Sequence, residues 1–291
     1  MDKATVKCTR KSVWHDSFLS ADYDRIQRLY RYCGLRGLKY LAPWHFYLDF
    51  VEVSITTRCN LQCPGCANLM PFYQKPYDVD SSTVLQTIRK IGECIDLCGN
   101  FRLLGGEPFL HPDLPRFLAE IPSEKCLRIS IPTNATLIPQ DPDLYEALRN
   151  KHVTVVLGNY PASAETQKLL IAKLEQECVS YELPGSGSWI DYGAPVSHER
   201  SPKALRSQFL RCRLRSKSVL NGVMYYCPRH SHGFDLGMIT RHDTEYVDIL
   251  NNTASQNRKQ IRKLMWRHKP VEACKYCLRG TDAAVDISRG K

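Results

Sequence analysis

Three cysteines stand close together in the sequence, as Cys59, Cys63 and Cys66, with the spacing C-x3-C-x2-C. Cysteine thiolates are the ligands of iron–sulfur clusters, and a [4Fe–4S] cube normally takes four of them. This loop supplies three. A cube held by three thiolates leaves one iron without a protein ligand, and an open coordination position is where a metal centre can do chemistry. Zinc is the alternative, but zinc ligands usually come as two C-x2-4-C pairs.

Two further motifs come later in the chain, and each follows a run of residues typical of a buried strand. Gly105-Gly106-Glu107-Pro108 follows residues 101–104, and Pro132-Thr133-Asn134 follows residues 127–131. The cysteine loop likewise follows the apolar residues 50–56. Active groups of β/α barrels lie at the carboxyl ends of the strands, so we expect the three loops to lie together.

The three motifs, in this order, resemble those of the radical S-adenosylmethionine (radical SAM) superfamily. In that family the open iron binds the amine and carboxylate of S-adenosylmethionine. The reduced cluster splits the sulfonium to give a 5′-deoxyadenosyl radical, which takes a hydrogen atom from the substrate. The resemblance implies that Cys59, Cys63 and Cys66 hold a [4Fe–4S] cluster. It also implies S-adenosylmethionine contacts at Gly105, Gly106, Glu107, Pro108, Ser130, Thr133 and Asn134.

A second set of four cysteines lies in the last third of the chain. Asn221-Gly222 between two alternating runs predicts a hairpin over residues 216–227, because both turn positions need positive φ. The pattern around it resembles the twitch domain, a truncated SPASM domain, which implies an auxiliary [4Fe–4S] cluster. A structural zinc site with four cysteine ligands is the alternative. The four cysteines are Cys212, Cys227, Cys274 and Cys277.

An auxiliary cluster with four protein thiolates has no open iron, so electron transfer is its natural role. We therefore expect the enzyme to oxidise or epimerise a small polar substrate, such as a sugar or an aminocyclitol, with an electron donor such as flavodoxin or ferredoxin. The alternatives are a peptide-modifying radical SAM enzyme and a non-catalytic metal and nucleic-acid-binding protein. No motif identifies the base or hydrogen donor, and the candidates are Tyr73, Asp191, Tyr192, Arg229, His230 and Cys33.

Composition limits where the protein works and what it binds. The 291 residues contain no apolar run long enough for a membrane span and no apolar segment of an export signal near Met1. The 13 cysteines are an odd number, which favours metal ligands in a reducing cytoplasm over disulfides. The net charge of +10 favours an anionic substrate. The basic residues in 255–269 are interpreted as a solvated helix face, with Ile261, Leu264 and Met265 turned inward, rather than a nucleic-acid site.

Strand and helix patterns alternate through the middle of the chain, which predicts parallel β/α units. With the resemblance, this implies an α/β fold: a partial (β/α)6 TIM-like barrel over 49–205, preceded by an extension over 1–48 and followed by a twitch domain over 206–291. One helix should carry a buried stripe from Val84 to Cys98. Strands are expected at 50–56, 101–104, 127–131, 153–157 and 178–183, and helices at 21–33, 81–98, 112–120, 142–150 and 164–177.

Overall fold

The computed structural model describes residues 44–183, 189–212, 217–282 and 286–287. The expected helix at 21–33 and the candidate Cys33 lie outside the described residues. No described helix is both long enough and apolar enough to cross a membrane.

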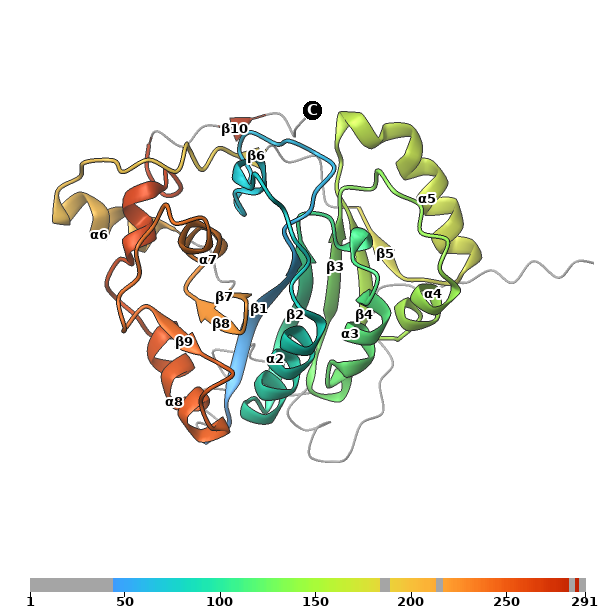
Figure 1. The fold of residues 1–291 in the computed structure, drawn as a ribbon, viewed down its shortest axis with the longest axis horizontal. Coiled ribbons are helices and arrows are strands. Elements are labelled where there is room, and N and C mark those ends of the chain that lie inside the picture. The colour runs from blue at the N-terminus through green and yellow to red at the C-terminus, as the bar shows by residue number, and fades with distance from the viewer. Residues whose placement is uncertain (1–43, 184–188, 213–216, 283–285, 288–291) are drawn as a thin grey trace, which may run out of the picture.

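One sheet with the strand order β5-β4-β3-β2-β1-β7-β8-β9 forms the body of the protein (Figure 1). Five parallel strands come first: β1 (Tyr47–Thr56), β2 (Leu97–Gly105), β3 (Ile129–Thr133), β4 (Val153–Leu157) and β5 (Tyr181–Glu182). The last three described strands of this sheet are β7 (Lys217–Leu220), β8 (Val223–Tyr225) and β9 (Tyr246–Asp248). The fold is therefore α/β with a mostly parallel sheet, as predicted.

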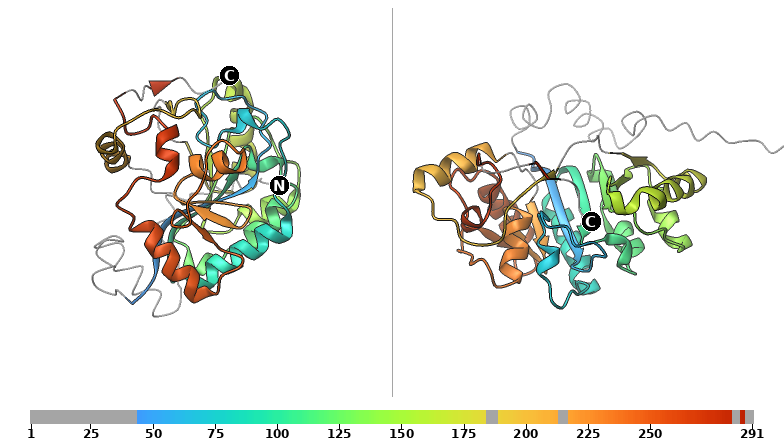
Figure 2. Two further views of the ribbon diagram at one scale, coloured as in Figure 1. Left: turned by 60° about the vertical axis from the view of Figure 1, so that its left-hand side comes forward. Right: turned by 90° about the horizontal axis from the view of Figure 1, so that it is seen from above.

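Helices connect the parallel strands and pack on the sheet (Figures 1 and 2). The connecting helices are α2 (Ser81–Cys94), α3 (Leu114–Glu120), α4 (Pro142–Leu148) and α5 (Ala164–Gln176). Later come α6 (Pro202–Arg211), α7 (Pro228–Asp235) and α8 (Ala254–Met265). Short helical turns include η1 (Met70–Phe72), η2 (Pro108–Leu110) and η5 (Glu272–Tyr276).

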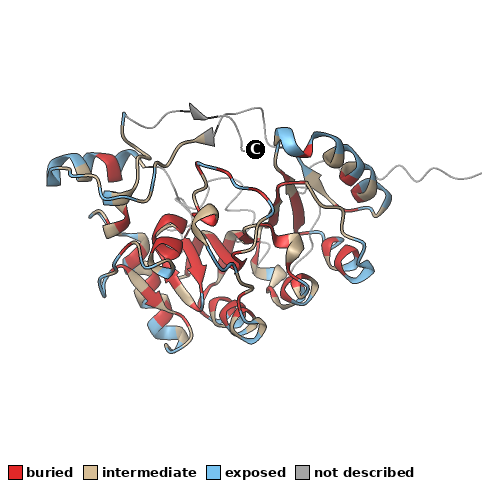
Figure 3. Cartoon of the chain, turned by 45° about the horizontal axis from the view of Figure 1, so that its top comes forward, coloured by how far each residue is buried: buried red, intermediate tan, exposed pale blue. Residues whose placement is uncertain are grey.

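The core lies between the sheet and these helices, where the strands are almost entirely buried (Figure 3). Val51, Val53 and Ile55 of β1 belong to this core. Because side chains alternate along a strand, Glu52 and Ser54 point to the opposite face. Strand β1 therefore has an apolar face toward the helices and a polar face that is available for a site.

Helix α2 is shorter than the sequence pattern predicts. Val84, Ile88 and Ile91 are buried in it as expected, but the helix ends at Cys94. The next residue, Ile95, is already extended, and the chain then pairs with the start of β1. Cys98 lies in β2 and not in the helix, so that part of the prediction was wrong. The apolar spacing simply continues across the turn, which hides the boundary.

The hairpin forms as predicted, with φ of 50° at Asn221 and 75° at Gly222. Its first strand, β7, pairs in parallel with β1, so the sheet continues beyond residue 205. Residues 49–205 supply only five strands of the parallel sheet, and β7 is the sixth. The additional strand β6 (Trp189–Ile190) pairs instead with β10 (Asp286–Ile287) in a separate two-stranded sheet.

Candidate functional site

The first cysteine set lies in the loop that leaves the carboxyl end of β1. Cys63 is buried, and Cys59 and Cys66 are half-buried. The loop is held by the bond from the Cys66 amide to the Cys63 carbonyl, 3.1 Å. Burial raises the pKa of the Cys59 thiol to about 11 and also raises that of Cys66. A bound cation or metal would therefore be needed to hold these sulfurs as thiolates at neutral pH.

The glycine turn after β2 packs directly on the cysteine loop. The Gly106 amide donates to the Thr56 carbonyl at 3.0 Å, and the Glu107 amide donates to the Arg58 carbonyl at 2.9 Å. A Cβ atom on Gly105 would lie 2.0 Å from the Thr56 oxygen. On Gly106 it would lie 2.1 Å from the Arg58 oxygen and 2.7 Å from Cys59 Cβ. Only glycine allows these two loops to approach so closely.

Glu107 joins the glycine turn to the third loop. Its buried carboxylate accepts hydrogen bonds from Thr133 Oγ1 at 2.8 Å and the Asn134 amide at 2.7 Å. Burial raises its pKa to about 7, although these bonds act in the opposite direction. The Asn134 side chain reaches back to Asn60 Oδ1 at 2.8 Å, next to Cys59. All three predicted motifs are therefore joined in one hydrogen-bonded cluster at the carboxyl ends of β1, β2 and β3.

Two predicted cofactor contacts are placed differently from the rest. Pro108 is buried as the first residue of η2, directly behind Glu107. Ser130 lies inside β3, where its hydroxyl donates to Asn100 Oδ1 at 2.8 Å and accepts from Arg102 Nε at 3.2 Å. Ser130 therefore belongs to the polar face of the sheet below the three loops.

The second cysteine set is gathered around the start of α7. Cys227 lies two residues after β8 and is the N-cap of α7, Cys212 is the C-cap of α6, and Cys274 and Cys277 lie in and directly after η5. Burial raises the pKa of the Cys227 thiol, and the charges of the other three cysteines raise it further. Burial also raises the pKa of Cys274, to about 12. The structure thus brings together four cysteines from three separate segments.

Residues of α6 and the preceding loop hold the second set in place. Gln208 Nε2 donates to the carbonyls of Cys277 at 2.7 Å and Cys274 at 3.2 Å. Arg200 donates to the same two carbonyls at 3.0 and 3.2 Å. A Cβ atom on Gly280 would lie 2.6 Å from the Gln208 carbonyl, so α6 and the cysteine loop are in close contact. Sequence reasoning missed both polar residues, although Gln208 lies one helical turn before Cys212.

Neither set is gathered tightly enough for a single ion. Within the described ranges, no three His, Cys, Asp or Glu side chains form a group that could hold one metal ion. The thiolates of a cube bind four different irons, so they lie further apart than the ligands of one tetrahedral zinc ion.

Some of the catalytic candidates lie near the first cysteine set and others lie near the second. The Tyr73 hydroxyl lies 2.9 Å from His232 Nδ1 and donates to Asp235 Oδ2 at 2.8 Å, and burial raises its pKa, so it stays protonated. Near the second set, Asp191 Oδ1 accepts from the Gly193 amide at 2.7 Å, and Arg279 donates to the Tyr192 hydroxyl at 2.9 Å.

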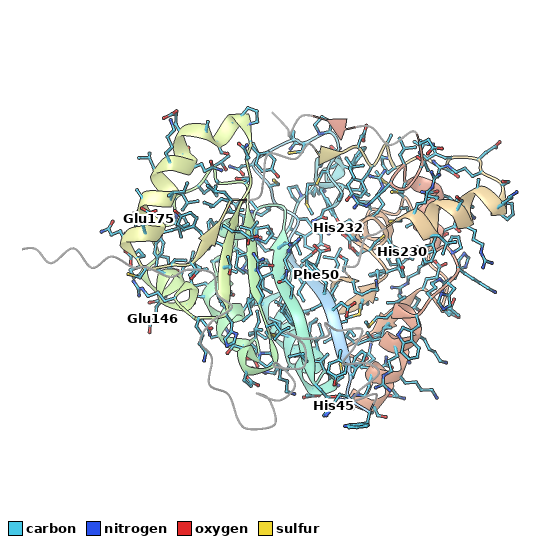
Figure 4. All side chains as sticks on the ribbon, turned by 180° about the vertical axis from the view of Figure 1, so that it is seen from behind. His45, Phe50, Glu146, Glu175, His230 and His232 are labelled. Atoms are coloured by element: carbon cyan, nitrogen blue, oxygen red, sulfur yellow. The ribbon has the colours of Figure 1, made fainter. Side chains whose placement is uncertain are left out.

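The remaining candidates lie on α7, where Figure 4 shows His230 and His232. Burial lowers the pKa of His230 to about 4 and that of His232 to about 3, so both are neutral at pH 7. His230 Nε2 is 3.8 Å from Glu245 Oε2, a carboxylate that is not part of the first cysteine loop. Arg229 is buried between the two cysteine sets. Sequence reasoning missed Ser54 and Asp235, which bind His232 and Tyr73, because no spacing connects them with the motifs.

Residues 53–170 match the family model described as the radical SAM superfamily. This part of the chain is a radical SAM domain. The match covers all three joined motifs and lies within the predicted barrel span of 49–205. It ends before the second cysteine set.

Curated relatives match the radical SAM domain over a limited length. The GTP 3',8-cyclase of Campylobacter lari is 30% identical over 99 residues, which covers 32% of this chain and 29% of the relative. That of Sulfurovum sp. is 34% identical over 95 residues, covering 32% and 29%. The chain thus spans about three tenths of the length of these relatives.

Two solved structures are similar over most of the chain. The crystal structure of BtrN in complex with AdoMet and 2-DOIA has 18% identity and a TM-score of 0.47, with 82% of this chain and 98% of that chain covered. Histidine-tagged anSMEcpe with bound AdoMet has 14% identity and a TM-score of 0.48, with 83% and 93% covered.

Proposed function

We propose that this protein is a radical SAM enzyme that abstracts a hydrogen atom from a small polar substrate. Cys59, Cys63 and Cys66 would hold the [4Fe–4S] cluster. Gly105, Gly106, Glu107, Pro108, Ser130, Thr133 and Asn134 would form the surroundings of S-adenosylmethionine. When bound, the cluster and cofactor together supply a reductively generated 5′-deoxyadenosyl radical.

The observation that carries this proposal is the contact between Gly106 and the cysteine loop. Any side chain at Gly106 would collide with Arg58 and Cys59. Such a contact aligns backbone groups of the glycine turn with the metal loop, which is what a small polar cofactor bound at an open iron requires. The role of Glu107 is to hold the Thr133-Asn134 loop in register with that turn.

We further propose that Cys212, Cys227, Cys274 and Cys277 hold an auxiliary [4Fe–4S] cluster in a twitch domain over 206–291. Two buried cations support an anionic group there. Lys217 is 5% exposed, with Nζ 4.0 Å from the centre of the Tyr226 ring, and the charges of Cys227 and Cys212 stabilise its ammonium. Arg229 is the other. A structural zinc ion is the alternative metal for this set, but the four thiols would have to move closer together to bind it.

The substrate proposal depends on the polar face of the sheet. Arg102 NH1 lies 3.4 Å from Glu52 Oε2, and Arg128 NH2 lies 2.7 Å from Glu182 Oε1. Charged side chains of both signs suit hydroxyl, amino or anionic groups, so we propose a carbohydrate or aminocyclitol substrate. With an auxiliary cluster available to accept an electron, oxidation is the preferred reaction, with epimerisation second.

Two other substrate classes are compared with this proposal. The curated relatives are named for GTP, but each match covers fewer residues than separate Cys66 from Cys212, so it cannot include both cysteine sets. A peptide substrate is the runner-up. The eleven cysteines of the described residues form no disulfide with one another, which supports work in the reducing cytoplasm with a flavodoxin or ferredoxin as electron donor.

The test is anaerobic reconstitution followed by reduction with S-adenosylmethionine present. We expect about eight irons per chain, as two cubes require, and release of 5′-deoxyadenosine. Cys63→Ala should remove about four irons and abolish the release, whereas Cys94→Ala, outside both sets, should change neither. If the reduced, iron-loaded protein releases no 5′-deoxyadenosine, the proposed radical SAM activity is refuted. Four irons with one zinc would refute the auxiliary cluster.

A further inference from the structure

Arg229 is a buried cation without a carboxylate partner at ion-pair distance among the described residues. It is 2% exposed and is the second residue of α7, two positions after Cys227. Its guanidinium donates to the carbonyl of Tyr276 at 3.0 Å and to the carbonyl of Gly193. Carbonyl oxygens satisfy hydrogen bonds but do not neutralise a charge. A buried ion costs several kcal/mol unless opposite charge lies nearby, so anionic groups must surround this side chain.

The groups near Arg229 that can carry negative charge, the cysteines when they bind metal as thiolates, come from both cysteine sets. Cys277 and Cys227 belong to the second set, and Cys66 belongs to the first. Asp191 is the remaining contributor.

The path of α7 explains how one residue reaches both sets. The helix begins directly after Cys227, and the Tyr276 carbonyl that Arg229 binds belongs to the residue before Cys277. Three residues beyond Arg229, His232 contacts Ser54 of β1 and Tyr73, which follows the first cysteine loop. The first turn of α7 therefore lies between the two sets, and Arg229 projects from that turn.

We propose that Arg229 is a positioning residue shared by both clusters, whose single positive charge favours the reduced state of each. The inference rests on the proposed function, because it requires both clusters. Reduction adds a negative charge to a thiolate-ligated cluster, and a fixed cation in a low-dielectric setting stabilises that added charge. Removal of the charge should lower both reduction potentials.

The test uses Arg229→Gln, which keeps hydrogen-bond donors and loses the charge, and Arg229→Lys, which keeps the charge. Reconstituted proteins are titrated anaerobically and followed by electron paramagnetic resonance. Cys274→Ala and Cys63→Ala backgrounds isolate the first and second cluster respectively. We expect Arg229→Gln to reduce the ratio of reduced to oxidised cluster about tenfold at a fixed potential, or 59 mV for one electron, at both clusters. Arg229→Lys should retain most of the wild-type value.

Lys217→Met is the matched control, because Lys217 is a buried cation whose cysteine neighbours, Cys227 and Cys212, both belong to the second set. It should lower the potential of the second cluster and leave the first unchanged. An unchanged first cluster in Arg229→Gln, with eight irons loaded, would overturn the shared role. Four irons and one cluster signal in the wild-type protein would instead refute the second cluster itself, and the inference with it.

A loading defect is also informative. If Arg229→Gln and Arg229→Met take up no iron while Arg229→Lys does, the charge is required for cluster assembly, which supports the inference. Equal loss of iron in all three variants would show that only the shape of the arginine matters and would overturn it.

Discussion

The Nδ1 atom of His232 lies 2.9 Å from the hydroxyl oxygen of Tyr73. The Tyr73 hydroxyl donates its hydrogen bond to Asp235, so the protonated Nδ1 is the donor to Tyr73, and Nε2 accepts from the Ser54 hydroxyl at 3.1 Å. Figure 4 shows His232 beside β1, the strand that also carries Phe50. The contact joins the segment after the first cysteine loop, β1 and α7 through one fully buried ring.

Tyr73→Phe should therefore destabilise the fold. It removes the acceptor of the buried His232 Nδ1 proton, and an unsatisfied buried donor costs about 1–3 kcal/mol. Urea unfolding of the reduced apo-protein measures the change. Tyr181→Phe is the control, because the Tyr181 hydroxyl binds Glu175 at the exposed surface, and it should cost less than about 0.5 kcal/mol. Equal costs for the two variants would show that the buried contact contributes nothing.

His232 should also give the protein a defined loss of stability in acid. Its folded-state pKa of about 3 lies below the ordinary value of 6.5, so the unfolded chain binds more protons between these values. The stability that neutral His232 contributes is present above pH 6.5 and is lost as pH falls toward 3. By pH 5 the loss should be about 2 kcal/mol. His232→Gln cannot titrate, so the free energy of unfolding should fall less in that variant; parallel pH profiles would contradict the assignment.

Gly106→Ala should prevent loading of the first cluster. The added methyl group would lie 2.1 Å from the Arg58 carbonyl oxygen and 2.7 Å from Cys59 Cβ, so the two loops must separate. Iron should fall by about four per chain, the content of one cube, with the far-ultraviolet circular dichroism retained. Gly237→Ala is the control, because its added Cβ meets nothing within 4 Å, although φ of +69° makes it strained. Normal iron content in Gly106→Ala would refute the close packing.

The arginines of α8 should be structural. Arg258 donates from Nε to the Cys94 carbonyl at 3.0 Å and pairs with Asp96, so it joins α8 to the end of α2. Arg258→Met should lower the free energy of unfolding by about 1–3 kcal/mol, the usual value for hydrogen bonds of a charged group. Lys259→Met, on the exposed side of the same helix, should change it by less than about 0.5 kcal/mol. Comparable effects would restore the interpretation of 255–269 as a purely solvated basic face.

Much of the fold could be predicted because its signals are local. Alternating apolar runs located β1 to β4, and Asn221-Gly222 located the β7–β8 turn, where both residues have positive φ. Strand β9 was missed, since three residues carry too little pattern. The pairing of β7 with β1 was also missed, because contacts between distant segments leave no local spacing.

In the site, too, local patterns could be predicted and contacts between distant segments could not. Cysteine spacing predicted both sets of cysteines that the structure gathers, and the glycine turn could be expected beside the first. His230 and His232 are only two positions apart, and sequence could not distinguish them. One faces the Tyr225 ring at 5.3 Å and the other faces Tyr73, because α7 turns them in different directions. Likewise, the sequence could not show that the charge of Arg229 is buried, and the role proposed for this residue depends on that burial.

The pairing of β7 with β1 has a practical consequence for anyone who shortens this chain. Truncation after residue 205 would leave β1, the longest strand of the sheet, as an unprotected edge with free amide and carbonyl groups. Such edges pair with other molecules and cause aggregation. The C-terminal segment therefore covers an edge of the sheet that residues 1–205 would expose, and soluble expression of residues 1–205 alone should fail.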